Sequence, residues 1–207
     1  ACAPFRRLYL CDKNLETISD YNSNARHKLL AEVCLAAKYE GDLIKTHYTE
    51  HEQTNLDTKS QLCTVLARSF ADIGDIVRGK DLYLGYDQKE KDQRKQLDDK
   101  LKEIFQQIHS EVTSSGSNGK TLQERYKNDT GDFFKLREDW WTANRATIWE
   151  ALTCEANGTY FRNTCNDSAD EKGPSVAKNK CRCDGANVVP TYFDYVPQFL
   201  RWFEEWA

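Results

Sequence analysis

Residues 88–112 read QKEKDQRKQLDDKLKEIFQQIHSEV, and this segment decides the fold class. Its apolar side chains recur every three or four residues, as they do on one face of an α-helix. They are Leu97, Leu101, Ile104, Phe105, Ile108 and Val112. The first half of the segment is charged nearly all round, which is typical of a solvated helix surface. We therefore predict one long amphipathic helix from about residue 88 to residue 112.

Four other segments show the same periodicity. The predicted helices span about residues 24–52, 57–77, 132–154 and 197–207. Residues 113–120, TSSGSNGK, predict a flexible loop, and residues 157–185 are low in apolar side chains. The sequence shows no strand of useful length and no internal repeat. Amphipathic helices must bury their apolar faces against one another, so we predict an all-α helical bundle.

The composition sets broad limits on function. The chain has 207 residues, of which 12% are aromatic, and this aromatic content argues against bulk disorder. Its formal net charge of −4 provides no overall positive field, so we expect no nucleic-acid partner. The sequence begins at Ala1 and ends within an amphipathic stretch, so we expect it to be a piece of a longer protein.

Cysteine is unusually frequent and scattered. The eight cysteines are Cys2, Cys11, Cys34, Cys63, Cys154, Cys165, Cys181 and Cys183. This pattern predicts disulfides in an oxidising, extracellular setting. The alternative is a zinc site with Cys165, Cys181 and Cys183, although no fourth ligand has suitable spacing. Cys63 and Cys154 fall in predicted helices and could meet if those helices are antiparallel neighbours.

The sequence gives no positive case for an enzyme, a cofactor or a metal. His47-Tyr48-Thr49-Glu50-His51 matches the H-x-x-E-H pattern of one class of zinc hydrolases. It lies near a predicted helix end in an exposed polar run, so a solvated helix terminus is the preferred interpretation.

Basic side chains form three local clusters that could hold sulfate groups, because arginine and lysine donate charge-assisted hydrogen bonds to oxyanions. The candidate glycan-binding residues are Arg6, Arg7, Lys89, Lys91, Arg94, Lys95, Lys178, Lys180 and Arg182. Glu90, Asp92, Asp98 and Asp99 are interleaved with the second cluster and nearly cancel its charge. A solvated, salt-bridged helix face is therefore the alternative interpretation there.

Four stretches resemble one family. They are CAPFRRLYLC at residues 2–11, ARSFADIGDIVRGKDL at 67–82, LREDWWTANR at 136–145 with Trp149 and Cys154, and VPQFLRWFEEW at 196–206. The chain resembles a Duffy-binding-like domain, alpha class, of the variant erythrocyte membrane protein of the falciparum malaria parasite. The resemblance covers essentially the whole chain, and the motifs occur in the family's order.

The resemblance implies a function in host-cell adhesion. Such domains are displayed on the infected erythrocyte as part of a membrane-anchored, antigenically variant adhesin. The implied partners are host erythrocyte receptors or sulfated glycans such as heparan sulfate in rosetting, host antibodies, and an adjacent cysteine-rich interdomain region. The alternative is a structural, antigenically variable spacer that presents a neighbouring adhesive domain.

The resemblance also implies an internal organisation. Residues 1–56 would be the end of subdomain 1 with a connecting helix, residues 57–156 the helical subdomain 2, and residues 157–207 the start of a truncated subdomain 3. It implies that Cys63 pairs with Cys154 and that Cys165 pairs with Cys181. Cys183, and Cys2 or Cys11, would then await partners beyond this sequence.

Overall fold

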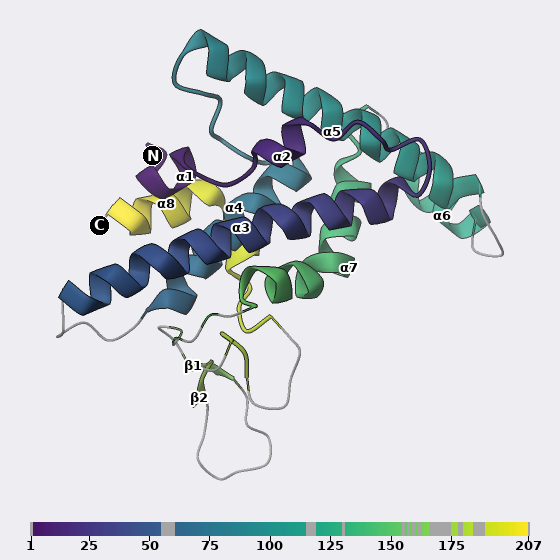
Figure 1. Ribbon diagram of the computed structural model, residues 1–207. Helices are drawn as coiled ribbons and strands as arrows, with labels where there is room; N and C mark the ends of the chain where they lie inside the picture. Colours follow the sequence, from purple (N-terminus) through teal and green to yellow (C-terminus); the bar gives the residue numbers. More distant parts are fainter. Residues whose placement is uncertain are drawn as a thin grey trace.

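The computed structural model describes residues 2–54, 61–114, 119–129, 131–154 and 189–206. Between residues 155 and 188 it describes residues 156, 158, 160, 163–165, 175–177 and 180–183. The predicted all-α class is confirmed: long helices lie across one another around a common core, with a small two-stranded sheet at one end (Figure 1).

The long helices follow the apolar periodicity of the sequence. The elements are α1 (Phe5–Leu8), α2 (Lys13–Glu16), α3 (Ala25–Thr54), α4 (Leu62–Arg78), α5 (Gln88–Ser114), α6 (Gly119–Tyr126), α7 (Phe134–Leu152), β1 (Asn163–Cys165), β2 (Ser175–Val176), the 3₁₀-helix η1 (Phe193–Tyr195) and α8 (Gln198–Trp206). Helix α6 occupies part of the region around residues 113–120 for which we predicted a flexible loop. Strands β1 and β2 pair antiparallel and are too short for an alternating pattern to reveal them.

Helix α4 is the centre of the molecule, and nearly all of its residues are buried. The Phe70 ring lies 5.0 Å from the Trp141 ring and 5.1 Å from the Trp149 ring, centroid to centroid, which fixes α4 against α7. Helix α3 packs along the same pair. An added Cβ at Gly41 would lie 2.0 Å from the carbonyl oxygen of Leu152, so only glycine allows α3 to approach α7 this closely.

One hydrophobic cluster joins all three segments of the predicted subdomain division. It includes Leu29 and Val33 from residues 1–56, Trp141 from residues 57–156, and Cys181 and Val189 from residues 157–207. Residues from all three segments therefore share one core, and the division at residues 56 and 156 stays a prediction.

The disulfides differ from the expected pairs. Cys63 is bonded to Cys181, with its sulfur atoms 2.07 Å apart, and Cys165 is bonded to Cys183. Both expected pairs, Cys63 with Cys154 and Cys165 with Cys181, are therefore wrong for this structure. The bond between Cys165 and Cys183 also corrects the expectation that Cys183 awaits a partner beyond this sequence. Because Cys165, Cys181 and Cys183 are all in disulfides, none of them has a free thiolate to bind zinc.

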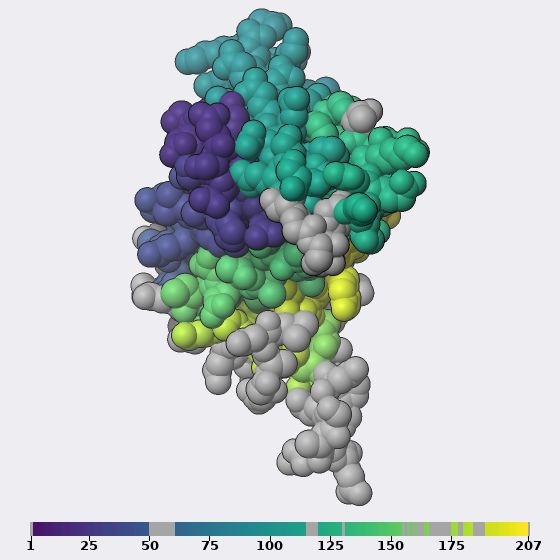
Figure 2. Space-filling model, turned by 90° about the vertical axis from the view of Figure 1, so that its right-hand side faces the viewer, coloured from purple at the N-terminus to yellow at the C-terminus, as the bar shows by residue number. Residues whose placement is uncertain are grey.

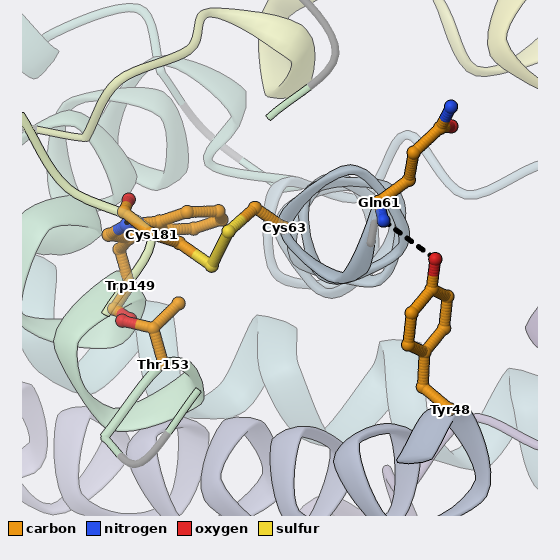
Figure 3. The surroundings of a disulfide bond; sticks show 6 residues. All are labelled: Tyr48, Gln61, Cys63, Trp149, Thr153 and Cys181. Carbon is orange, nitrogen blue, oxygen red and sulfur yellow. Dashed lines mark hydrogen bonds between the residues drawn. A yellow bond between two sulfur atoms is a disulfide. The ribbon is translucent and has the colours of Figure 1, made fainter. Parts of the chain in front are cut away.

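The packing at the end of α7 explains the difference. The Trp149 indole donates a hydrogen bond to the carbonyl oxygen of Cys181 at 3.2 Å and holds this residue beside Cys63 (Figure 3). Cys154 lies beyond the last residue of α7, where its side chain is exposed and its thiol is free. Cys2, Cys11 and Cys34 are also free.

No helix in the described part of the chain is long and apolar enough to cross a membrane.

The first turns of α5 project beyond the rest of the molecule, at the top of Figures 1 and 2. This projection carries Lys89, Lys91 and Lys95 of the second basic cluster into solvent.

Candidate functional site

The N-terminal arginines are engaged inside the protein. The Arg6 guanidinium makes a bidentate contact with Glu205 at 3.0 and 2.9 Å, and it lies 2.7 Å from Asp72. The Arg7 side chain is 1% exposed and donates to Asp81 through two nitrogens. These side chains therefore tie α1 to α4, α8 and the segment after α4, and they are not presented to an external anion.

Arg94 joins the same internal set although it lies on α5. Its guanidinium donates to Asp12 through two nitrogens and reaches Glu16 at 3.5 Å. Because Asp12 is also 3.9 Å from Arg7, one carboxylate connects the first and second basic clusters. The structure thus brings Arg7 and Arg94 together, around a buried acid and not on an open surface.

A second ion-pair network connects α4, η1, α7 and α8. Arg201 donates to Asp72 at 2.6 Å and to Asp75 at 2.5 Å. Arg145 binds both oxygens of Asp194, at 2.9 and 2.6 Å. Since these residues come from the quoted motifs or lie beside them, the motifs hold the scaffold together. Buried arginine–carboxylate pairs are costly to break because the remaining charge is left uncompensated.

The two acids of α4 have opposite pKa shifts. Burial opposes ionisation of Asp72, but the charges of Arg6 and Arg201 hold its pKa below the ordinary value. For Asp75, burial dominates over the attraction of Arg201 and Arg78 and raises the pKa to about 6. As pH falls, Asp75 is therefore protonated before Asp72.

The lysines of the second cluster are differently placed. Lys89, Lys91 and Lys95 are exposed, and none has an ion pair with another described side chain. Lys91 and Lys95 are one turn apart and share a face of α5. Lys89 lies about 200° round the helix from Lys91, so it faces another direction. The cluster thus separates into a pair of lysines and one lysine on the other side.

The third cluster is only partly described. Lys180 is exposed, and Arg182 is half-buried with a nitrogen 3.4 Å from an oxygen of Glu150. Lys178 lies outside the described residues. In the H-x-x-E-H segment His47 is exposed on α3, while the side chains of Glu50 and His51 are also outside the description. Among the described residues no group of acids, histidines and cysteines could hold a metal ion.

A groove of about 510 Å³ lies between α5 and the segment that joins it to α4. Leu84, Leu97 and Leu101 contribute apolar surface, and Lys91 and Lys95 line it together with Arg94. Sequence reasoning found the lysines but gave no role to Tyr83 and Leu84. The signal for them was weak: three large apolar side chains, Leu82, Leu84 and Tyr86, alternate along an exposed segment.

Tyr83 fixes this segment against α5. Its hydroxyl donates to Glu90 at 2.5 Å, and the backbone N–H of Tyr86 donates to the same carboxylate at 2.7 Å. Burial and this hydrogen bond raise the pKa of Tyr83 to about 12, so the hydroxyl remains a donor at neutral pH. The wall of the groove is therefore held by specific contacts.

The architecture defines a class: a disulfide-bonded helical domain in which Arg6, Arg7 and Arg94 are engaged by internal acids, while Lys89, Lys91 and Lys95 are presented on a projecting helix. The sequence matches the family described as Duffy binding domain over residues 1–201. The chain therefore belongs to the Duffy binding domain family.

Solved structures agree with this assignment. The NTS-DBL1(alpha-1) domain of PfEMP1 from the Plasmodium falciparum varO strain is 40% identical, with a TM-score of 0.74, over 100% of this chain and 43% of that chain. The NTS-DBL1-alpha and CIDR-gamma double domain of the varO PfEMP1 is 40% identical, with a TM-score of 0.76, over 100% of this chain and 27% of that chain.

A more distant structural match is the DBLbeta domain of the PfEMP1 variant IT4var13, which was solved bound to ICAM-1. It is 31% identical, with a TM-score of 0.67, over 100% of this chain and 44% of that chain. The chain thus spans less than half the length of each of these solved chains. No curated protein matches the sequence.

Proposed function

We propose that this chain is part of an extracellular adhesion module of a variant surface protein on the infected erythrocyte, and that it contacts host erythrocyte receptors or sulfated glycans. Membership of the Duffy binding domain family supports the proposal. A DBLbeta relative at 31% identity was solved with ICAM-1 bound, so adhesion to a host protein has a precedent in the fold.

The observation that carries the glycan assignment is the different placement of arginines and lysines. Arg6, Arg7 and Arg94 are occupied by internal carboxylates, which leaves fewer donors for a ligand. Lys89, Lys91 and Lys95 are exposed on the projecting part of α5, with Lys180 and Arg182 as further cations near the disulfides. A flexible polyanion can bind such lysines without a preformed pocket.

Contacts of this kind are weak one by one and sensitive to salt. An exposed ion pair contributes about 0.2–1 kcal/mol, and salt screens it over a Debye length of about 10 Å at 0.1 M. Many copies on a cell surface would compensate through avidity. Host antibodies would meet the same exposed helix, and an adjacent cysteine-rich interdomain region would be a further contact of the intact protein.

The test is binding of the oxidised chain to immobilised heparin at 0.1 M and 0.5 M salt. The triple variant Lys89→Glu, Lys91→Glu and Lys95→Glu is compared with a control that reverses three exposed lysines elsewhere, Lys38, Lys120 and Lys127. Both variants have the same net charge. We expect the first triple variant to lose binding and the control to keep most of it. Equal losses would show that only net charge matters and would contradict the assignment.

The second candidate function is a structural, antigenically variable spacer. It is favoured by the acids interleaved along α5, because Glu90, Asp92 and Asp99 offset the charge of the neighbouring lysines. A folded chain that binds neither heparin nor erythrocytes would support the spacer and contradict the adhesion proposal.

A further inference from the structure

The groove beside α5 combines an apolar surface with a cationic one, and a sulfated glycan would not use both together. We propose that it binds an acidic peptide segment that carries an apolar side chain, presented by a protein receptor. This proposal goes beyond glycan binding, although it rests on the same adhesive role and shares two lysines with it.

The apolar part of the groove is formed by leucines. Leu97 and Leu101 are buried at 3% and 1% exposure and form the base on α5, while Leu84 on the opposing segment is 71% exposed. A leucine with most of its surface in water gains stabilisation when a ligand covers it, and saccharides offer little apolar surface for this purpose. The volume of about 510 Å³ lies within the usual range of ligand sites, roughly 300–1,000 Å³.

The charged part of the groove is cationic where it meets solvent. Lys91 and Lys95 line it on the same face of α5 and have no ion pair within the described residues. Arg94 lies between them in sequence, and its Nε is buried without a hydrogen-bond acceptor although its other nitrogens bind Asp12. The two lysines offer donors to a carboxylate that enters the groove, whereas Arg94 is already engaged by Asp12.

Two acids also line the groove, and both are already compensated. Asp81 accepts hydrogen bonds from Arg7 and from Gln198, the latter at 2.9 Å. Asp98 accepts from two nitrogens of Arg137 at 3.2 Å each and lies 2.9 Å from Lys102. Lys91 and Lys95 are therefore the charges in the groove that are not compensated, and they attract anionic groups. A carboxylate-rich peptide is electrostatically complementary to them.

The chain provides matched controls for both surfaces. Leu82 is two residues from Leu84 and 53% exposed, but it does not line the groove. Lys89 is two residues from Lys91 and points away from the groove. Because all of these side chains are largely exposed, serine or glutamate at these positions should leave the fold intact, which near-ultraviolet circular dichroism would check.

The experiment measures fluorescence anisotropy of a labelled peptide of sequence EELEFEEL, with EESESEES as the polar control. We expect Lys91→Glu/Lys95→Glu to weaken binding about tenfold and Leu84→Ser about fivefold. Leu82→Ser and the pair Lys89→Glu/Lys127→Glu should stay within about twofold of the unchanged chain. The polar peptide should bind at least about fivefold more weakly than the apolar one.

Parallel heparin binding separates this proposal from the glycan assignment. Leu84→Ser should weaken peptide binding and leave heparin binding unchanged. Equal affinity for the two peptides, or equal losses in Leu82→Ser and Leu84→Ser, would overturn the groove proposal. Heparin binding without any peptide binding would overturn it too, while the adhesive role of the lysines would stand.

Discussion

The disulfide between Cys63 and Cys181 should contribute more to stability than the disulfide between Cys165 and Cys183. It joins positions separated by 118 residues, whereas the bond between Cys165 and Cys183 spans 18. The chain-entropy model gives about 5 kcal/mol for the longer loop and about 3 kcal/mol for the shorter one. Measured values are commonly 2–4 kcal/mol, so we expect the double variant Cys63→Ala/Cys181→Ala to lose about 3–5 kcal/mol.

The assay is urea unfolding under non-reducing conditions, followed by tryptophan fluorescence. Trp149 donates to the carbonyl oxygen of Cys181, so its emission should also report the loss of this contact. Cys154→Ala is the matched control, because its thiol is exposed and free, and it should change the free energy of unfolding by less than about 0.5 kcal/mol. A loss in Cys154→Ala as large as the loss in the double variant would refute the pairing and favour the bond between Cys63 and Cys154.

Three further changes test the packing and the ion pairs. Gly41→Ala should cost about 1–2 kcal/mol in urea unfolding, because the added methyl group meets the Leu152 carbonyl oxygen at 2.0 Å and this outweighs the helix propensity of alanine; unchanged stability would mean that α3 and α7 are farther apart. Asp194→Asn should cost about 3–5 kcal/mol, since it leaves a buried arginine without its counter-charge; a loss below about 1 kcal/mol would contradict the buried pair. The pKa of Asp75, raised from 3.8 to about 6, predicts that the contribution of this acid to stability falls as pH rises from about 4 to 6, and the lowered pKa of Asp72 predicts a loss of stability below about pH 4. The combined contribution of the two acids should therefore be greatest near pH 4, and Asp75→Asn should remove the decline in melting temperature between pH 4 and 6; a decline that persists there in Asp75→Asn would contradict the pKa assigned to Asp75.

Periodicity predicted the long helices because burial imposes it locally. The apolar face of residues 88–112 is the buried face of α5, and Leu97, Leu101, Ile104, Phe105 and Ile108 are all in the core. The role of Gly41 could not be predicted, because a sequence shows the cost of glycine in a helix but not the neighbouring helix that requires it. Helix α6 was missed because serine, glycine and asparagine just before it predict a loop.

The sequence could not reveal which distant charges are partners. Arg6 and Arg7 appear as a basic cluster with no acid beside them, yet Asp72 and Glu205, far along the chain, neutralise Arg6 in the fold. The same limit applies to the disulfides, since spacing left several pairings open. Among the candidate site residues that the structure describes, Lys89, Lys91, Lys95 and Lys180 keep the accessibility that their charge suggested.

Binding to uninfected erythrocytes, measured by flow cytometry at physiological salt, tests most directly whether the lysines of α5 form the adhesive surface. The oxidised chain, the triple variant at Lys89, Lys91 and Lys95, and the control triple variant at Lys38, Lys120 and Lys127 are compared with and without soluble heparin. We predict that the unchanged chain and the control bind, that heparin competes, and that the α5 variant does not bind. Equal binding by all three proteins would contradict the role of α5, and a folded chain that does not bind at all would contradict the adhesive function proposed for these residues.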